Sequence, residues 1–526
     1  MGSAVGIPKF AVYVMEWTTD LRVKFIGYYD GREFRGFRDV DEFTAFLLTG
    51  PARTVYAHAG GSYDVLHMLG PLIRSDSVMR GFFSGVSLVG LTVSTPNGKV
   101  TLADSLFLIQ SSVKQLGEWV GKPKLDFDHT VEHDYAVYEP YCRRDCEILY
   151  DAISRFEAVV QELGVEMRLT VGATAMALAK HYGGVFPLSG ITDRYLTPAY
   201  FGGRTEDIRK GFHTDVRCYD INSAYPWAMT QAIPGAFLGA SKNRPPPPYF
   251  VHAKNIRASG FHGPIPIRTP LGLYYPVGVI PEAILSDVEA ALVDDFEPVT
   301  YYRFAVNHHL ARLVEKLYAL RMEGGASSLV YKILANSIYG KFAERAEKDA
   351  LLVHPSKPPT DGVVMMPGVY RTVQIVNIPH RNIATAAYIT ALVRAKLYGY
   401  MNPNTLYVDT DGFWTTDTLP ATSAALGDIK LEKEAKEFHV LQPKVYRYDD
   451  TVRAKGYRHL TTAQFDDLAR GRKVTLEPTM HRARGMLRRG MLTPSLRDVT
   501  KGMHYHKPKR RPDGSSWDFA EIVTED

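Results

Sequence analysis

The sequence predicts a multidomain chain of the α/β plus α+β class. Its 526 residues exceed the size at which one hydrophobic core usually divides into separate domains. An apolar content of 45% is typical of a globular protein rather than a disordered one. The chain from position 1 to position 160 alternates short β-type runs with helical patterns, and a second unit begins near position 190.

The first unit has an α/β layout. Runs of β-type residues predict strands over 10–14, 54–57 and 100–103, and helical periodicity predicts helices over 41–48 and 144–163. The second unit is interrupted by four prolines at 245–248, which cannot continue a helix or an interior strand and so mark a surface connection. A stretch with three prolines and a glycine, 347–366, is flanked by β-type residues and has the composition of an insertion.

The positive charge is unevenly distributed. The formal net charge of +5 is small for this length, but Arg470 to Arg511 contains thirteen Lys or Arg and only two acids, Glu477 and Asp498. Such a block is either a solvated tail or a contact surface for a polyanion.

The cysteine content and the hydropathy of the sequence indicate in which cellular compartment the protein is found. Cys142, Cys146 and Cys218 are too few for a disulfide framework and favour a reducing environment. Cys142 and Cys146 have no second Cys/His pair, which favours core residues over zinc ligands. No apolar run approaches the roughly 20 residues that span a bilayer, and no signal-peptide pattern is present. We therefore expect a soluble intracellular protein without a membrane partner.

Three acidic residues are candidate metal ligands. Asp409 and Asp411 are two apart in a β-type run, so strand alternation predicts that both carboxylates point the same way. Asp220 ends another β-type run, and the three would converge if the strands were neighbours. Carboxylate oxygens suit Mg²⁺, with Mn²⁺ as a substitute, and two such ions can activate a 3′ hydroxyl and stabilise a leaving pyrophosphate.

A helical segment supplies candidate triphosphate ligands. Lys332, Asn336 and Tyr339 share one helix face, and Arg321 belongs to the preceding helical segment. Two cations facing the carboxylates would bind β and γ phosphates, and Tyr225 beneath the sugar would exclude a 2′ hydroxyl. Singly, each feature is more often an ordinary surface or strand residue. Their joint occurrence indicates nucleotidyl transfer to deoxynucleotides.

Three segments of the chain resemble motifs A, B and C of the family B DNA polymerases. They are 219–226 (YDINSAYP), 332–340 (KILANSIYG) and 407–411 (YVDTD), with Gly412 where the family has serine. In addition, 200–204 (YFGGR) resembles the Y-x-G-G element that contacts template. Lys444-Val445-Tyr446 resembles the K-x-Y element that holds the primer end, and Lys455-Gly456 resembles the basic pair that follows it.

The resemblance implies a DNA-directed DNA polymerase with an RNase H-like 3′-5′ exonuclease-type domain followed by a right-hand palm, fingers and thumb. The implied boundaries are an exonuclease-like domain at 1–190 and a polymerase domain at 191–526. Within the latter we expect a palm at 191–240 and 377–460, a shortened first insertion at 241–300, fingers at 301–345, a second insertion at 346–376 and a thumb at 461–526.

The resemblance also implies roles for individual residues. The catalytic residues would be Asp220, Asp409 and Asp411, and the metal ligands Asp220, Ile221 and Asp411. The nucleotide-binding residues would be Tyr225, Arg321, Lys332, Asn336 and Tyr339. The DNA-binding residues would be Tyr200, Gly202, Gly203, Arg204, Lys444, Tyr446 and Lys455.

Spacing favours the protein-primed branch of phages, viruses and linear plasmids. The interval from Asn336 to Asp409 contains the Pro-rich stretch, which resembles an insertion associated in the family with strand displacement and processivity. The interval from Asp220 to Lys332 could hold only a shortened first insertion, which in relatives touches the priming protein. The sequence leaves open whether the primer is a terminal protein or an ordinary nucleic acid.

The exonuclease motifs are incomplete. Tyr141 to Asp145 matches the third family motif, and Glu16 and Asp64 remain in the first two. Val14 replaces the first aspartate, which in relatives bridges both metals, and Ala59 replaces an asparagine. Two-metal hydrolysis needs that bridging oxygen, so we expect exonuclease activity to be weak or lost. Asp104 could be a substitute ligand or a cap.

The expected partners are primer–template DNA, deoxynucleoside triphosphates and a terminal protein primer. We expect the chain to be a monomer and to replicate a viral or plasmid genome. Reverse transcriptases and RNA polymerases share a palm with two aspartates but lack the 332–340 pattern. The alternative from a different class is an inactive polymerase-like DNA-binding or initiation factor, which the intact Asp220, Asp409 and Asp411 disfavour.

Overall fold

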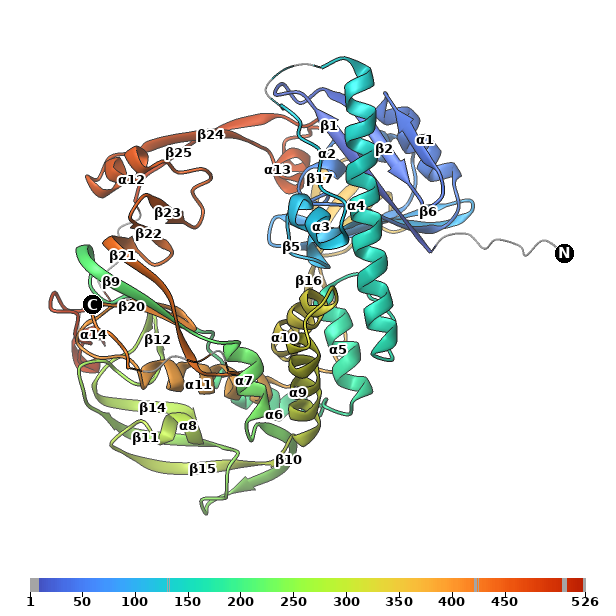
Figure 1. The fold of residues 1–526 in the computed structure, drawn as a ribbon. Coiled ribbons are helices and arrows are strands. Elements are labelled where there is room, and N and C mark those ends of the chain that lie inside the picture. Colours follow the sequence, from blue (N-terminus) through green and yellow to red (C-terminus); the bar gives the residue numbers. More distant parts are fainter. Residues whose placement is uncertain are drawn as a thin grey trace.

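The computed structural model describes residues 9–129, 131, 133–420, 423, 425–503 and 509–523. Figure 1 shows the N-terminal domain on one side and the palm and first insertion on the other, with β24 (Val474–Met480) and β25 (Leu496–Lys501) extending between them at the top. The helices α9 (His308–Met322) and α10 (Ser328–Phe342) join the two sides lower down. No helix among the described residues is long and apolar enough to cross a membrane.

The N-terminal domain is an α/β unit built on a ten-stranded sheet of order β17-β18-β16-β5-β6-β7-β4-β1-β2-β3. Its own strands are β1 (Phe10–Trp17), β2 (Val23–Tyr29), β3 (Phe34–Phe37), β4 (Arg53–Ala57), β5 (Met79–Ser84), β6 (Ser87–Thr95) and β7 (Gly98–Asp104). Its helices are α1 (Val40–Thr49), α2 (Asp64–Arg74), η1 (Ser105–Phe107), α3 (Val113–Val120), α4 (Tyr135–Glu162) and α5 (Val171–His181). The α/β layout and all five predicted elements are confirmed, although α4 begins at Tyr135 rather than at the predicted position 144.

Cys142 and Cys146 are confirmed as core residues. Both are buried free thiols on α4. The Cys146 Sγ–H donates to the Gly27 carbonyl at 3.4 Å. This contact places the face of α4 that carries both thiols directly against strand β2.

The second insertion is part of the N-terminal sheet. Its strands are β16 (Glu347–Val353), β17 (Val363–Met366) and β18 (Val369–Ile375), and β16 pairs antiparallel with β5. Leu351, Val353 and Val369 lie in the same apolar cluster as the N-terminal strands. A segment inserted between fingers and palm thus extends the sheet of a domain from which it is far removed in sequence.

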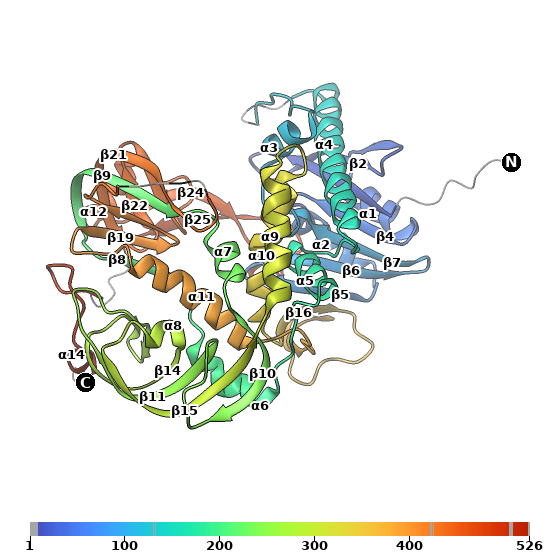
Figure 2. The same cartoon turned by 60° about the horizontal axis from the view of Figure 1, so that its bottom comes forward.

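The palm is a seven-stranded antiparallel sheet of order β23-β22-β21-β9-β20-β19-β8. Its strands are β8 (Arg204–Asp207), β9 (Gly211–Ile221), β19 (Thr405–Thr410), β20 (Gly412–Thr415), β21 (Ile429–Gln442), β22 (Val445–Tyr448) and β23 (Thr451–Ala454). Its helices are α6 (Gly190–Leu196), η2 (Thr197–Ala199), α7 (Ala224–Thr230) and α11 (Ile383–Tyr398). Helix α11 is buried on almost every face, because it lies between the palm sheet and the first-insertion sheet (Figure 2).

The first insertion and the fingers complete this half of the molecule. The insertion is a four-stranded sheet of order β10-β15-β11-β14, with bounds β10 (Pro234–Ser241), β11 (Tyr249–Ala258), β14 (Gly278–Ser286) and β15 (Asp295–Val306). It also holds β12 (Ile267–Thr269), β13 (Gly272–Tyr274) and α8 (Asp287–Ala290). The fingers are two helices, α9 (His308–Met322) and α10 (Ser328–Phe342).

The predicted thumb, 461–526, does not form one body in its described part. Helix α12 (Thr462–Ala469) and the hairpin β24 (Val474–Met480) and β25 (Leu496–Lys501) follow the palm. Helix α13 (Ala483–Arg488) packs instead into the N-terminal core through Met486 and Leu487. Residues 509–523, including α14 (Phe519–Val523), return to the first insertion. The basic block 470–511 is continuous in sequence, but its described parts lie in three separate places: next to the palm, in the N-terminal core and on the first insertion.

Candidate active site

The three motif segments meet at one end of the palm sheet. Strand β9 pairs with β20, so that Asp220 lies opposite Gly412, and β20 pairs with β19, so that Asp409 also lies opposite Gly412. The Ile221 amide donates to the Asp411 carbonyl at 2.8 Å. The first and third motifs are therefore in direct backbone contact.

A tight turn, rather than strand alternation, positions Asp411. The Asp411 amide donates to the Asp409 carbonyl at 2.8 Å, and Thr410 between them has a φ of 69°. This is the pattern of a γ-turn with positive φ, a strained conformation for a β-branched residue. The expectation that both carboxylates share a strand face is wrong, because Asp411 lies beyond the last residue of β19.

Asp220 and Asp411 form an electrostatically strained pair. Burial and the neighbouring Asp220 raise the pKa of Asp411 to about 7. Burial raises the pKa of Asp220 to about 6, and Lys430, at 3.7 Å from its carboxylate, only partly opposes this. Two half-buried carboxylates close to each other favour a cation between them.

Asp409 has a different partner. Its carboxylate forms an ion pair with Lys444 and accepts a hydrogen bond from the Tyr407 hydroxyl at 3.4 Å. In the part of the chain that is described, no three His, Cys, Asp or Glu side chains gather around one point suited to a metal. The donor set that fits a divalent ion is therefore Asp220 and Asp411, with the backbone of Ile221 adjacent, and Asp409 stands beside it.

Gly412 leaves room next to Asp220. A Cβ at this position would lie 3.0 Å from the Tyr219 carbonyl oxygen and 3.3 Å from Oδ1 of Asp220. A side chain here would crowd the carboxylate, whereas glycine leaves it free to move. The glycine that stands where the family has serine in the third motif therefore leaves space beside Asp220.

Three of the predicted nucleotide-binding residues, Arg321, Tyr225 and Tyr339, lie near this acidic pair. Arg321, on α9, donates to Oγ of Ser223 in the first motif at 2.8 Å. Tyr225 and Tyr339 stack with ring centroids 4.0 Å apart and planes at 2°. Lys332 and Asn336 are exposed on α10.

The backbone of the Y-x-G-G loop is held by a buried arginine that sequence reasoning did not identify. Arg394, 2% exposed on α11, donates to the carbonyls of Phe201 and Gly202, each at 2.9 Å, and to Glu289 at 2.5 Å. Gly203 packs so closely that a Cβ would lie 2.9 Å from the Tyr225 hydroxyl. An arginine inside an apolar helix was the signal that could have identified Arg394, since a buried charge needs a partner.

The structure corrects the prediction that Arg204 contacts DNA. Its side chain is 1% exposed, pairs with Glu206 at 2.7 Å and lies over the Tyr275 ring at 3.8 Å. A guanidinium enclosed in this way cannot reach a phosphate. Of the other predicted contacts in this loop, Tyr200 is half-buried and Gly202 is exposed.

A cavity of about 430 Å³ adjoins Asp409 on the thumb side. It is lined by Lys444, Tyr446 and Lys455, together with Arg453 and His459. All three predicted primer-end residues therefore lie in one basic hollow next to the acidic pair.

The exonuclease-like residues also lie together. Glu16, Asp64, Tyr141 and Asp145 line a cavity of about 450 Å³, and Val14 lines it too. Lys124 forms an ion pair with Asp145, and His129 lies 3.6 Å from Glu16. Burial raises the pKa of Glu16 to about 8 and that of Asp64 to about 7.

Asp104 is a cap rather than a substitute ligand. Its carboxylate accepts hydrogen bonds from the Leu106 amide at 3.0 Å and the Gly61 amide at 3.2 Å. Both oxygens are thereby committed to backbone donors. Lys124 and His129, which sequence reasoning did not identify, place nitrogen atoms beside Asp145 and Glu16.

A larger cavity of about 1010 Å³ lies between the N-terminal domain, α5, α10 and the second insertion. Asn336 and Tyr339 line it on the fingers side. The opposite wall presents aromatic and cationic side chains, including Phe83, Phe107 and Arg168. Stacking surfaces and cations are the features with which proteins hold single-stranded nucleic acid.

Comparison with known proteins agrees with this geometry. The family described as DNA polymerase type B, organellar and viral, matches residues 129–244. The DNA-directed DNA polymerase of Enterobacteria phage PRD1 is 24% identical over 460 residues, covering 80% of this chain and 78% of the phage protein. A probable DNA polymerase of Neurospora intermedia is 25% identical over 385 residues, which are 60% of this chain and 39% of the fungal protein.

Solved structures show the same fold. Phi29 DNA polymerase matches over 94% of this chain and 100% of its own, with TM-scores of 0.74 alone and 0.72 in complex with primer–template DNA, at 19% identity. The exonuclease-type domain followed by palm, fingers and thumb is thus confirmed as the fold class. With its three motifs assembled on such a palm, the chain is similar to the family B DNA polymerases of the organellar and viral group.

Proposed function

We propose that this protein is a DNA-directed DNA polymerase that extends a primer 3′ hydroxyl with deoxynucleotides. One observation carries the proposal. The backbone contact between Ile221 and Asp411 brings the acids of two distant motifs together. Arg321 and Tyr225 contact the first motif and Tyr339, respectively, and Lys332 is exposed on the helix that carries Tyr339.

Asp220 and Asp411 would hold two divalent ions, with Mg²⁺ as the natural choice and Mn²⁺ as a substitute. Such ions lower the pKa of an attacking hydroxyl and stabilise a leaving pyrophosphate. Bound cations would also oppose the burial that raises both carboxyl pKa values and the repulsion by Asp220 that adds to it at Asp411.

The remaining residues bind and orient. Arg321 and Lys332 would bind the triphosphate, with Asn336 supporting it. The ring of Tyr225, stacked on Tyr339, would lie beneath the sugar and exclude a 2′ hydroxyl.

The DNA would contact two regions near the acidic pair. The 430 Å³ hollow with Lys444, Tyr446 and Lys455 would receive the primer end. Tyr200 and the backbone of Gly202 and Gly203 would contact the template strand. The 1010 Å³ cavity behind Tyr339 would receive unpaired template before it is copied.

We further propose that the protein replicates a viral or plasmid genome in the host cytoplasm, acts as a monomer and accepts a terminal protein as primer. The three-stranded second insertion would support strand displacement. Because Val14 offers no oxygen to bridge a metal pair, the exonuclease-like site would hydrolyse DNA weakly or not at all. Incubating an unprimed template with a candidate terminal protein and labelled nucleotide tests the priming, through covalent label on the protein.

Primer extension in Mg²⁺ tests the central proposal. Asp411→Asn should lower the single-turnover rate by about 10³-fold or more, since the metal site contributes several kcal/mol. Asp361→Asn, an exposed carboxylate on the second insertion, is the matched control and should extend like wild type. Extension that survives Asp411→Asn would remove the assignment, and a wild type that binds DNA without extending it would favour the initiation-factor alternative.

A further inference from the structure

The last described segment, 509–523, returns from the thumb and lies across the first insertion. The Val277 amide donates to the Trp517 carbonyl at 3.0 Å, and the Phe519 amide donates back to the Val277 carbonyl at 2.9 Å. The Ser516 amide donates to the Phe261 carbonyl at 2.9 Å. Ile522 is buried, and Phe519 packs on the apolar cluster of the insertion. We call this segment the C-terminal strap.

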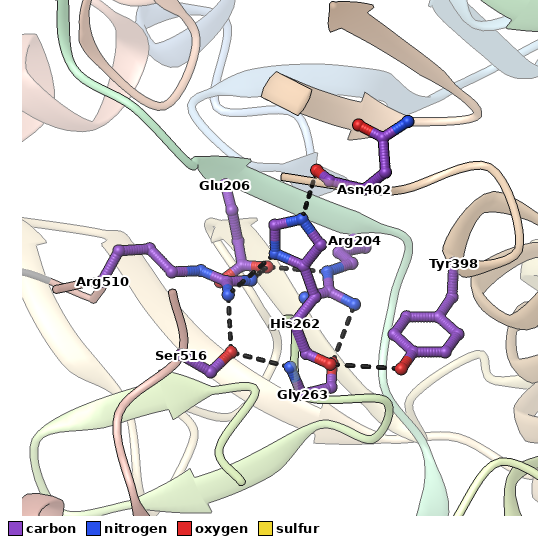
Figure 3. A network of polar contacts seen from close by, with 8 residues as sticks. All are labelled: Arg204, Glu206, His262, Gly263, Tyr398, Asn402, Arg510 and Ser516. Atoms are coloured by element: carbon purple, nitrogen blue, oxygen red, sulfur yellow. Dashed lines mark hydrogen bonds and ion pairs between the residues drawn. The ribbon is translucent and has the colours of Figure 1, made fainter. Parts of the chain in front are cut away.

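Arg510 is the central side chain of the strap and is 6% exposed. Its guanidinium binds Glu206 on β8 through two nitrogens, at 2.7 and 3.2 Å. The remaining nitrogen donates to Oγ of Ser516 at 2.5 Å and contacts Nδ1 of His262 at 3.3 Å. Figure 3 shows these residues converging from the palm, the first insertion and the strap.

The histidine contact has a defined direction. Nε2 of His262 lies 2.8 Å from the Asn402 carbonyl oxygen, which can only accept, so Nε2 carries the proton. Burial lowers the pKa of His262 to about 4, which keeps the ring neutral. Nδ1 is therefore an acceptor for Arg510, and every polar atom in this contact has a complementary partner.

Glu206 holds two arginines at once. Arg204 donates to the same carboxylate at 2.7 Å and to the Gly263 carbonyl at 3.1 Å. Ser516 in turn accepts from the Gly263 amide at 2.7 Å. With one carboxylate between two buried cations, removing Arg510 would leave Arg204 paired with Glu206 and Gly263 but would free β8 from the strap.

Strand β8 connects this network to the active site. Its residues pair with β19, with Arg204 opposite Thr410 and Thr205 opposite Asp409. The Y-x-G-G loop ends where β8 begins, and Gly203 already packs against Thr410. Any freedom gained by β8 is therefore transmitted to the loop that would contact DNA.

We propose that the C-terminal strap fixes the DNA-contacting loop 200–204, with Arg510 as the positioning residue that acts through Glu206. This rests on the polymerase function proposed above. It also gives a second role to a residue of the basic block: Arg510 holds protein rather than a polyanion. The strap joins palm, first insertion and the end of the thumb at one buried ion pair.

The test compares Arg510→Met in the full chain with Arg511→Met. The control removes the adjacent arginine, which pairs with Glu521 at the surface. Anisotropy with a labelled primer–template gives the dissociation constant, and single-nucleotide addition at saturating DNA gives the chemical rate. We expect Arg510→Met to raise the dissociation constant about tenfold or more and to leave the rate within about twofold. Hydrogen exchange should show lost protection in 204–207 and 261–264 but not in the N-terminal sheet.

Ser516→Ala keeps the test decisive if Arg510→Met folds poorly. It removes only the hydroxyl between Arg510 and Gly263, and should raise the dissociation constant about threefold. Unchanged DNA affinity in both variants, or a slower chemical step with unchanged affinity, overturns the inference. Wild-type protein that does not bind primer–template overturns both this inference and the proposed function, whereas normal wild-type binding with unaltered variants overturns only the inference.

Discussion

Glu206 offers a quantitative prediction on stability. Burial alone would raise its pKa, but Arg510 and Arg204 outweigh burial and lower the pKa from 4.5 to about 2. A pKa lowered on folding means that the carboxylate stabilises the folded state at all pH values above its unfolded pKa, and that this contribution is lost as the pH falls toward 2. Burial also lowers the pKa of Arg510, yet an arginine stays protonated over this whole range.

The magnitude follows from the two pKa values. Each pH unit between them corresponds to about 1.4 kcal/mol, so the ionised carboxylate contributes about 3 kcal/mol at neutral pH. Glu206 is 2% exposed, so solvent screening does not reduce this value. Glu206→Gln, which leaves two buried arginines without a counter-charge, should cost about 3–5 kcal/mol.

Hydrogen exchange of the β8 amides measures this locally, which avoids treating a multidomain chain as two-state. At pH 6.5 we expect the free energy of opening to fall by about 3–5 kcal/mol in Glu206→Gln and to stay unchanged in Glu347→Gln, an exposed carboxylate on β16. Between pH 4.5 and 3.5 the wild-type advantage should shrink by about 1 kcal/mol. An advantage that is absent at pH 6.5, or one that does not change on acidification, would refute the reasoning.

Further outcomes concern activity. Tyr225→Val should raise incorporation of ribonucleotides relative to deoxynucleotides by about 10–100-fold in single-nucleotide assays, because about 1–3 kcal/mol of steric exclusion is removed, and unchanged discrimination would contradict this. Wild type should barely shorten a labelled single strand in Mg²⁺, while Val14→Asp should shorten it at least about tenfold faster; rapid shortening by wild type would refute the interpretation of Val14. Arg394→Lys should weaken primer–template binding more than it slows chemistry, since one ammonium nitrogen replaces the two guanidinium nitrogens that separately bind the two carbonyls and Glu289. Affinity for primer–template should fall linearly with salt on a log–log plot, and a flat plot would exclude phosphate contacts as the main source of binding.

Sequence reasoning was most successful where local pattern decides structure. The strands at 10–14, 54–57 and 100–103 and the long helix ending near 163 follow from side-chain periodicity. The motif segments predicted which acids would meet, and the pairing of β9 with β20 brings Asp220 beside Asp411. Roles assigned by resemblance still await the experiments above.

Sequence reasoning failed where contacts between residues that are distant in the sequence determine the structure. Nothing in 347–353 indicates that β16 will pair with β5, because strand pairing between distant segments leaves no local signal. Arg204 was expected at the DNA because its neighbours match a motif, but burial against Tyr275 and Glu206 decides its role. The basic block 470–511 looked uniform by charge, whereas Arg484 pairs with Asp349 and Arg510 is enclosed.

Manganese binding tests the central claim most directly. Electron paramagnetic resonance can count Mn²⁺ bound in the presence of primer–template and a non-hydrolysable deoxynucleotide. We predict that Asp220→Asn and Asp411→Asn each abolish the binding that wild type and Asp361→Asn retain. Undiminished binding by either of the two variants would show that these carboxylates do not share the metal site, and would contradict the account.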